Sequence, residues 1–323
     1  KRRIGILERI QVTVVLAQAL KRERVLVLVA LIDYANMYWA AKMAYKYNVR
    51  VSHARDEHCA CAMADGYARA TGKVGVATTT CGPGFTQIMT ALTIAARGNV
   101  PMVVFAGDAP IGSAWYLQQI DMGPLTLATG AHYIPVRSID RMLDNVREAF
   151  QVAQVERRPV VLGVPMDLQA QEYPYMADYM PSSSIVPTAQ RPLPDPVIVD
   201  RLIDMIEASD KPIILAGRGA VRSGARGALG ELAERSGALL ATSLFGKGLF
   251  DGNPYALDIA GAFASDFSRE LFAESDLVIG VGAGLGHYTT EGGYLYPMAQ
   301  VAQTDVNPRG LRQGLRPACV AFP

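Results

Sequence analysis

The sequence predicts an α/β fold with two doubly wound domains, each built on a parallel sheet. Short runs of β-branched residues alternate with longer segments of helical periodicity, the pattern of parallel strands covered by helices on both faces. A Pro- and Ser-rich stretch at residues 178–195 has neither period and is typical of a linker. Because 50% of the 323 residues are hydrophobic, the chain can bury a separate core on each side of that linker.

The elements of both domains follow from the same patterns. In the first domain, residues 1–177, we expect strands at 24–30, 50–53, 74–79, 102–106 and 160–164. In the second domain, residues 196–323, we expect helices at 196–208 and 225–236 and strands at 212–216, 238–242, 276–281 and 300–305.

The composition argues against nucleic acid or a membrane as a partner. Thirty-one basic and 30 acidic residues leave a net charge of +1, and no apolar run approaches the roughly 20 residues of a membrane-spanning helix. The four cysteines contain no CxxC pair, and neither they nor the four histidines have metal-ligand spacing. We therefore expect a cytoplasmic protein with a small-molecule ligand, no disulfide framework and no metal-ligating residue of its own.

One carboxylate stands out by its position. Glu57 follows an expected strand and lies in the first turn of the next helix, where doubly wound sheets form binding crevices. The rest of this helix is lined with small residues, namely Ala60, Ala62, Ala64 and Ala68. Their size predicts a buried interface with another helix or subunit. We expect Asp65-Gly66 to bend or break the helix and Gly72 to end it.

The next expected strand runs into Gly82-Pro83-Gly84, a tight turn before a helix expected at 85–96. The two glycines allow the backbone to approach a ligand closely. Taken alone, however, the tripeptide is explained by an ordinary turn between a strand and a helix.

Together, these segments closely resemble the pyrimidine-binding domain of the thiamine diphosphate enzymes that include acetolactate synthase, pyruvate oxidase and 2-oxo acid decarboxylases. The resemblance is carried by Glu57, by residues 65–69 (Asp-Gly-Tyr-Ala-Arg) and 71–73 (Thr-Gly-Lys), and by Gly82-Pro83-Gly84. It continues through residues 101–108, 117–121 and 158–167.

The resemblance implies thiamine diphosphate as cofactor and gives Glu57 and Gln118 catalytic roles. In this family, a glutamate at the position of Glu57 bonds to N1′ of the aminopyrimidine and promotes the tautomer whose 4′-imino group removes the C2 proton. Such a carboxylate works best when it is desolvated. Gln118 matches a glutamine that reaches the active site of the neighbouring subunit. From the residues alone, Glu57 could instead be a solvated acid at a helix start, and Gln118 an exposed loop residue.

Further cofactor contacts are implied at the turn. Pro83 and Gln87 match positions that touch the pyrimidine ring, with Gly82 and Gly84 beside them, although many acetolactate synthases have Asn at the position of Gln87.

In the second domain, glycines gather at expected strand ends. Gly217-Arg218-Gly219 follows one strand and Gly282 follows another, and backbone amides at such positions suit the phosphates of a nucleotide. Neither glycine run fits the GxGxxG fingerprint. These segments, with Asp305 after a later strand, resemble the central domain of the same enzymes, which binds FAD or ADP in some members and is empty in others.

Two departures from the family limit what the resemblance implies. The sequence contains no Gly-Asp-Gly followed by Asn, the motif that holds Mg²⁺ and the diphosphate, so we expect the diphosphate-binding domain to be absent from this chain. Relatives also have a Phe-Gly-x-Pro-Gly turn that faces the partner subunit's cofactor, whereas residues 29–37 of this chain contain no glycine.

The resemblance thus implies thiamine diphosphate-dependent decarboxylation or carboligation of a 2-oxo acid by a lyase or transferase similar to acetolactate synthase, working as a homodimer or homotetramer. One alternative is a catalytically silent chain that dimerises and at most binds a nucleotide. Another is a chain whose diphosphate-binding domain is supplied by a separate polypeptide.

Overall fold

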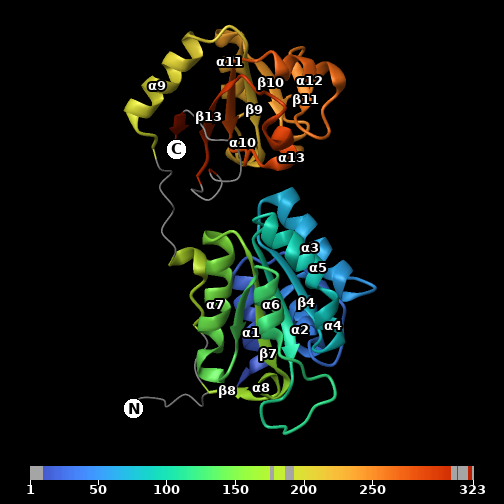
Figure 1. Cartoon of the computed structure of the whole chain (residues 1–323). Helices are drawn as coiled ribbons and strands as arrows, with labels where there is room; N and C mark the ends of the chain where they lie inside the picture. Colours follow the sequence, from blue (N-terminus) through green and yellow to red (C-terminus); the bar gives the residue numbers. More distant parts are fainter. Residues whose placement is uncertain (1–9, 175–177, 186–192, 307–310, 312–318, 322–323) are drawn as a thin grey trace, which may run out of the picture. The chain divides into compact units, whose positions relative to one another are not determined.

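The computed structural model describes residues 10–174, 178–185, 193–306, 311 and 319–321. It divides the chain into two compact units, residues 1–189 and 190–323, and each is described here by itself (Figure 1). The division falls inside the stretch expected to be a linker, of which residues 186–192 lie outside the described part. Each unit contains a six-stranded sheet with helices on both faces, which confirms the predicted fold class.

In the first unit the sheet has the order β3-β2-β4-β5-β7-β6, and all neighbouring strands are parallel. The strands are β2 (Val27–Ala30), β3 (Arg50–His53), β4 (Gly75–Thr79), β5 (Met102–Asp108), β6 (His132–Pro135) and β7 (Pro159–Pro165). The helices are α1 (Val12–Arg22), α2 (Met37–Tyr47), α3 (Glu57–Thr71), α4 (Pro83–Gln87), α5 (Met89–Arg97), α6 (Met122–Ala128), α7 (Ile139–Val155) and α8 (Met166–Gln169). A short antiparallel pair, β1 (Ile10–Gln11) with β8 (Glu172–Tyr173), joins the two ends of this unit.

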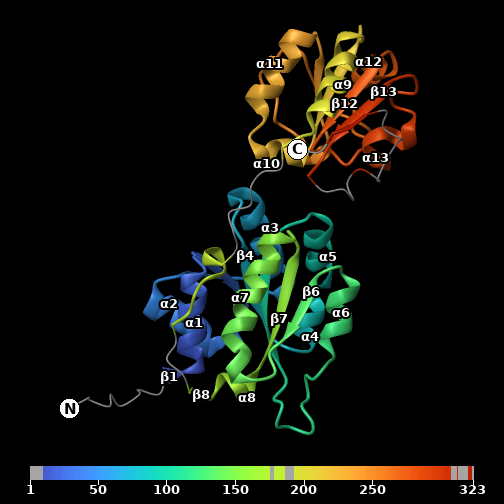
Figure 2. The ribbon, with the colours of Figure 1, turned by 90° about the vertical axis from the view of Figure 1, so that its left-hand side faces the viewer.

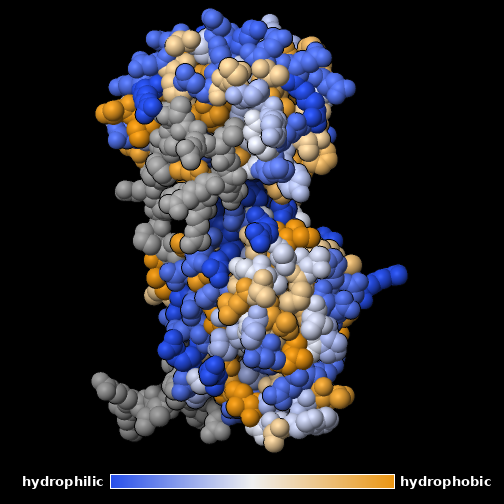
Figure 3. Space-filling view, in the orientation of Figure 1, coloured by the Kyte–Doolittle hydropathy of each residue, from blue (hydrophilic) through white to orange (hydrophobic). Residues whose placement is uncertain are grey.

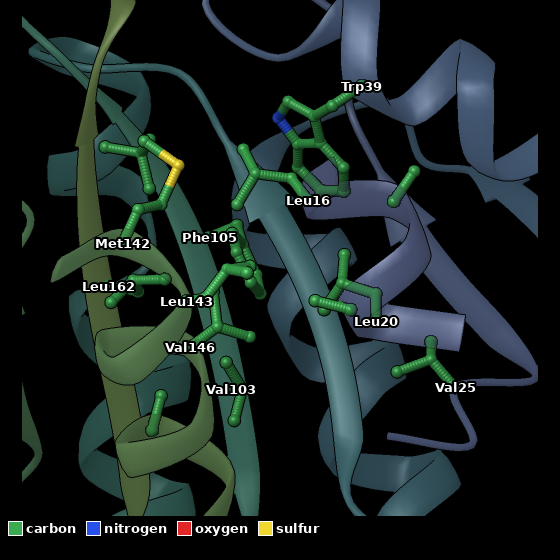
Figure 4. Close-up of a cluster of buried hydrophobic side chains, with 14 of the residues drawn as sticks. Leu16, Leu20, Val25, Trp39, Val103, Phe105, Met142, Leu143, Val146 and Leu162 are labelled. Atoms are coloured by element: carbon green, nitrogen blue, oxygen red, sulfur yellow. The ribbon is translucent and has the colours of Figure 1, made fainter. Parts of the chain in front are cut away.

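Two separate cores hold helices on the two faces of this sheet (Figure 2). One core packs α1, α2 and α7 against the sheet, and its centre is drawn in Figure 4, where the Trp39 ring lies 5.2 Å from that of Phe105. The other core packs α3, α5 and α6 on the opposite face. Alternation along β5 explains the division, because Val103 points into the first core and Val104 into the second. The strands are buried on both faces and therefore lack polar alternation.

The second unit repeats this architecture with the order β11-β10-β9-β12-β13-β14, again all parallel. Its strands are β9 (Pro212–Ala216), β10 (Leu239–Thr242), β11 (Ala256–Ile259), β12 (Leu277–Val281), β13 (Gln300–Thr304) and β14 (Cys319–Ala321). Its helices are α9 (Pro196–Glu207), α10 (Arg218–Ser223), α11 (Arg226–Ser236), α12 (Asp266–Ala273) and α13 (His287–Thr290), with 3-10 turns η2 (Leu244–Gly246) and η3 (Glu291–Gly293). Helices α9, α10 and α11 pack on one face of the sheet, and α12 packs on the other.

Every strand expected from the sequence is present, but five were missed. β1 and β8 have two residues each, and β6, β11 and β14 are short strands at sheet edges, so all five have too few residues to establish a period. The helix expected at 85–96 is divided at Ile88 into α4 and α5. Edge strands and short helices carry the weakest periodic signal, and this accounts for the differences.

The structure corrects one expectation for α3 and confirms another in part. The helix runs without a break through Asp65-Gly66, because Gly66 keeps helical geometry in open space, and it ends at Gly72, which has φ +71°. Ala60, Ala64 and Ala68 lie in the core that α3 shares with the sheet and with helix α5, as expected of a buried helix interface, whereas Ala62 is exposed. The small residues therefore serve close packing of the helix on β4, where a β-carbon on Gly75 would overlap the Ala64 carbonyl.

The first residues of the expected linker belong to the first unit. The Glu23 carboxylate accepts hydrogen bonds from the Tyr179 hydroxyl at 2.5 Å, the Ser182 backbone N–H at 2.7 Å and the Ser182 hydroxyl at 2.6 Å. Ser182 begins the 3-10 turn η1 (Ser182–Ser184), and Arg147 lies over the Tyr179 ring. The high proline and serine content of residues 178–195 indicated a segment without helical or strand periodicity. It did not indicate that the first residues of this segment are bound to Glu23.

Among the helices of the described residues, none is long and apolar enough to cross a membrane.

Candidate functional site

The connections of the first sheet diverge at one point of its carboxyl edge, between β2 and β4. β2 leads into α2 on one face, whereas its neighbour β4 leads into α4 and α5 on the other. Two adjacent strands whose connections diverge form the topological switch point at which doubly wound sheets bind ligands. The loops that flank this point are residues 31–36 after β2 and residues 80–82 after β4.

Glu57 opens α3 beside this switch point. The Asp56 side chain caps the helix by accepting a hydrogen bond from the Cys59 backbone N–H at 2.7 Å, so that Glu57 is the first helical residue. Glu57 is only 8% exposed, and a β-carbon on Gly84 would overlap its Oε1 atom. Among the described residues, no hydrogen bond reaches its carboxylate. A buried acid with unused acceptor capacity is costly to folding and marks a candidate ligand contact.

Gln118 lies at the same place, although 61 residues separate it from Glu57 in the sequence. Its loop, residues 109–121, connects β5 to α6. Gly82 has φ +61°, and a β-carbon there would lie 2.6 Å from the Gln118 carbonyl oxygen. The Cys81 thiol donates a hydrogen bond to Gln118 Oε1 at 3.6 Å. The turn after β4 thus joins Gln118 to the neighbourhood of Glu57.

Pro83 and Gln87 are exposed residues of α4, which begins at Pro83 directly after the turn. Gly82 and Gly84 on either side of Pro83 are buried, and their lack of side chains makes room for Gln118 and Glu57 respectively. The structure therefore brings together Glu57, Gly82, Gly84 and Gln118 by direct contact, and it places Pro83 and Gln87 in the short helix that begins at this turn.

The glycine-free loop after β2 closes through a side chain. Asn36 is 1% exposed, accepts a hydrogen bond from the Asp33 backbone N–H at 2.9 Å and donates one to the Leu31 carbonyl at 2.9 Å. All residues from 31 to 36 are described, and none has a positive φ. Hydrogen bonds of the Asn36 side chain therefore stabilise this turn, which in relatives depends on glycine residues and their wider range of backbone angles.

This loop also packs against the strand beside β4. A β-carbon on Gly107, near the end of β5, would overlap that of Ala35. Gln169 of α8 donates hydrogen bonds to the carbonyls of Ala35 and Val164, each at 3.0 Å. The loop is therefore fixed at the carboxyl edge, with Tyr34 pointing outward at 62% exposure.

Burial changes the acidity of two groups at this edge that the sequence analysis did not select. Burial raises the pKa of the Cys81 thiol, with the carboxylates of Asp108 and Asp33 acting in the same direction. Burial also raises the pKa of Asp108, with Asp121 adding to the effect and the Ala109 N–H opposing it. Cys81 follows β4 closely and Asp108 ends β5, and this position at the carboxyl edge is the signal that could have selected them.

The loop that carries Gln118 exposes a hydrophobic surface at this edge. Ile111, Trp115 and Leu117 are 57%, 74% and 80% exposed. In the space-filling view, apolar side chains are seen among polar ones where the loop between β5 and α6 lies (Figure 3).

The glycines of the second unit also meet at a switch point, between β9 and β12. Ala216, Val281 and Thr304 are paired in register, so Gly217, Gly282 and Asp305 follow at the same carboxyl edge. Gly217 and Gly219 pack directly against Gly282, with no space for a β-carbon on any of the three.

These glycine amides are already used within the protein. The Gly217 N–H donates to the Val281 carbonyl at 2.8 Å, and the Gly219 N–H donates to the Gly282 carbonyl at 2.9 Å. The Gly282 N–H donates to the Thr304 carbonyl at 2.8 Å. A phosphate at this edge would need other donors, and the guanidinium of Arg218, over the Phe245 ring at 5.1 Å, is one.

The fold and the buried acid at its switch point define a ligand-binding α/β protein of two domains. Comparison with known families identifies both domains. Residues 10–124 match the model described as thiamine pyrophosphate enzyme, N-terminal TPP binding domain, and residues 199–321 match the central domain of the same enzymes.

Curated relatives point to the same family. The chain is 33% identical over 264 residues to the acetolactate synthase large subunit of Parasynechococcus marenigrum, covering 79% of this chain and 42% of the relative. It is 33% identical over 267 residues to the acetolactate synthase of Arthrospira platensis, covering 79% and 45%. It is 29% identical over 269 residues to the probable acetolactate synthase large subunit of Methanocaldococcus jannaschii, covering 81% and 45%.

The chain therefore belongs to the thiamine pyrophosphate enzymes and contains their N-terminal and central domains. It spans less than half the length of these relatives.

Proposed function

We propose that the chain supplies the pyrimidine-binding half of a thiamine diphosphate-dependent active site that decarboxylates or carboligates a 2-oxo acid, as a lyase or transferase similar to acetolactate synthase. The observation that carries the proposal is the Glu57 carboxylate, which is buried at the switch point of the first sheet with no partner among the described residues. The similarity to acetolactate synthase large subunits supports the reaction class.

The residues at this edge fit an aminopyrimidine. Such a ring needs an acceptor for the N–H at N1′, and Glu57 has unused acceptor capacity in a buried place. A flat ring also needs groups to pack against, and the exposed Pro83 and Gln87 are such groups. Gly82 and Gly84 support the site indirectly, because they let Gln118 and Glu57 lie close to the turn.

When bound, thiamine diphosphate supplies a thiazolium that accepts the electrons released when the bond to the carboxylate carbon breaks. The role of the protein is to prepare that group. Glu57 would accept a hydrogen bond from N1′ of the aminopyrimidine, and burial would strengthen this bond because the surrounding dielectric is low. Gln118 offers amide N–H groups that can orient the carbonyl oxygen of a substrate.

Assembly is part of the proposal. Gln118 lies in a loop with exposed Trp115 and Leu117, which suits a subunit interface, and we propose a homodimer or homotetramer in which Gln118 serves the neighbouring active site. Mg²⁺ and the diphosphate would be held by a diphosphate-binding domain. The free thiols of Cys59, Cys61 and Cys81 support the expected cytoplasmic location.

For the second unit we keep FAD or ADP as a proposed ligand. Arg218 and Asp305 at the carboxyl edge are the residues that support it, through a phosphate contact and a hydroxyl contact respectively.

The test is calorimetric titration with thiamine diphosphate and Mg²⁺ of the purified chain combined with a polypeptide that carries a diphosphate-binding domain, after the intact mass of the chain has been measured. We expect binding by the wild type, at least about tenfold weaker binding by Glu57→Gln because a charged acceptor is lost, and no change for Glu148→Gln, an exposed acid on α7. Absence of binding by the wild type, or equal binding by Glu57→Gln, contradicts the proposal.

A further inference from the structure

The Cys81 thiol contacts the side chain of Gln118. Cys81 is 1% exposed in the turn after β4, and its thiol donates a hydrogen bond to Gln118 Oε1 at 3.6 Å. With the amide oxygen directed toward Cys81, the two N–H groups on Nε2 are directed away from it, which is the arrangement a carbonyl substrate needs.

The next residue holds the backbone of the same glutamine. A β-carbon on Gly82 would lie 2.6 Å from the carbonyl oxygen and 2.9 Å from Cβ of Gln118. Consecutive residues of one turn therefore contact the main chain and the side chain of Gln118.

Other residues of the Gln118 loop have their own anchors. Gly112 N–H donates to Asp167 Oδ2 at 3.0 Å, the Ser113 hydroxyl donates to the Trp115 carbonyl at 2.6 Å, and the Tyr116 hydroxyl donates to Met166 Sδ at 4.0 Å. The Gln119 N–H donates to the Tyr116 carbonyl at 3.0 Å. None of these bonds involves the Gln118 amide. An irregular loop without a helical or sheet ladder leaves a long side chain several rotamers, so the orientation of the amide depends on the thiol.

The surroundings of Cys81 keep its proton in place. The thiol packs with Ala35 and Met166, and Tyr116 lies against this small cluster. Burial raises the pKa of Cys81, and the Asp108 and Asp33 carboxylates act in the same direction, so the thiol remains a donor at neutral pH.

We propose that Cys81 is a positioning residue, whose thiol orients the Gln118 amide toward the substrate through this hydrogen bond. The proposal rests on the catalytic role of Gln118 in the proposed function. It predicts that a hydroxyl can replace the thiol, because both donate one hydrogen bond, and that a methyl group cannot.

The first test measures the orientation directly and needs no turnover. In protein labelled with ¹⁵N-glutamine, the Gln118 side-chain amide is assigned by its loss in Gln118→Leu. We expect its fast motion to increase in Cys81→Ala and to return to the wild-type level in Cys81→Ser. Cys61→Ala is the matched control, because Cys61 is a buried thiol in α3 that contacts Met102 rather than Gln118. Unchanged motion in Cys81→Ala overturns the proposal.

The second test uses steady-state kinetics with pyruvate, thiamine diphosphate, Mg²⁺ and a polypeptide that carries a diphosphate-binding domain. We expect kcat/KM to fall about fivefold in Cys81→Ala, as for one lost hydrogen bond, mainly through kcat, with recovery in Cys81→Ser and no change in Cys61→Ala. Equal kinetics for Cys81→Ala and Cys61→Ala overturn the positioning role. A wild type without turnover counts against the proposed function, and the amide motion then decides the role of Cys81 alone.

Discussion

Gly84 lies directly against the carboxylate of Glu57, so that a β-carbon at position 84 would overlap Oε1 of the acid and Cγ2 of Thr80. The two residues come from different elements, Gly84 from α4 and Glu57 from the start of α3. The absence of a side chain at one position is therefore what allows the acid at the other to be buried without being displaced.

This contact predicts the effect of a single methyl group. Gly84→Ala must move Glu57, Thr80 or the start of α4, and we expect it to cost about 1–3 kcal/mol of stability through overpacking. We also expect thiamine diphosphate to bind at least about tenfold more weakly, since the Glu57 carboxylate would lose its alignment with the ligand. Calorimetric titration and thermal unfolding measure the two effects. Binding by Gly84→Ala as tight as that of the wild type would show that the Glu57 position is not critical.

Most of the site could be predicted because its residues lie in short motifs. Glu57 follows a strand directly, and Gly82-Pro83-Gly84 ends the next one, so local sequence fixes both positions at the same sheet edge. The contact of Cys81 with Gln118 could not be predicted, since it depends on the path of an irregular loop between positions 37 residues apart. Tertiary packing alone determines such contacts.

Prediction from sequence also failed within α3. Gly66 after Asp65 suggested a bend, but the hydrogen bonds of the helix and the packing of Ala60, Ala64 and Ala68 in the core outweigh the low helix propensity of one glycine. The loop at residues 29–37 could be predicted only in part. Its lack of glycine indicated a turn that differs from the Phe-Gly-x-Pro-Gly turn of relatives, but the sequence did not show that the Asn36 side chain closes it.

Gly66 is expected to be a site of stabilisation. A β-carbon there meets nothing within 4 Å and the residue is helical, so Gly66→Ala should raise the unfolding free energy by about 0.5–1 kcal/mol. Gly72→Ala should lower it by about 1 kcal/mol, because Gly72 has φ +71°. Urea unfolding followed by tryptophan fluorescence measures both, since Trp39 and Trp115 both lie in the first unit. A loss of stability in Gly66→Ala would mean that α3 does bend at this position.

The Glu23 contacts predict how the chain leaves the first unit. Glu23→Ala removes the acceptor of three hydrogen bonds and leaves the hydroxyl of Tyr179, which is 2% exposed, without its partner. We expect a loss of about 2 kcal/mol and faster proteolysis within residues 178–185. Ser182→Ala added to Glu23→Ala should cost less than it does in the wild type, because the bond between the Ser182 hydroxyl and Glu23 is already lost and only the bond from Gln154 to that hydroxyl remains to be broken. Full additivity of the two changes would exclude a shared network, and Glu148→Ala on α7 serves as the exposed control.

Asp276 gives the second unit a pH dependence whose direction can be stated. Asp276 directly precedes β12 and accepts hydrogen bonds from the Ser209 hydroxyl and from the backbone N–H groups of Asp210 at 2.8 Å and Lys211 at 3.1 Å. Burial opposes ionisation of this carboxyl, but the three donors outweigh burial and hold its pKa below the ordinary value of 3.8.

Because the folded pKa is the lower one, the ionised form favours the folded state. This contribution is fully present above pH 3.8 and is lost as the pH falls through the folded pKa. We expect Asp276→Asn to lower the melting temperature at neutral pH, since the amide presents N–H groups to two backbone donors. The difference from the wild type should shrink as the pH falls below 3.8, whereas Asp200→Asn, an exposed change on α9, should give no such trend. Calorimetric unfolding across this range measures the difference. If the difference in melting temperature between the wild type and Asp276→Asn stays constant with pH, the stabilisation comes from packing at Asp276 and not from its charge.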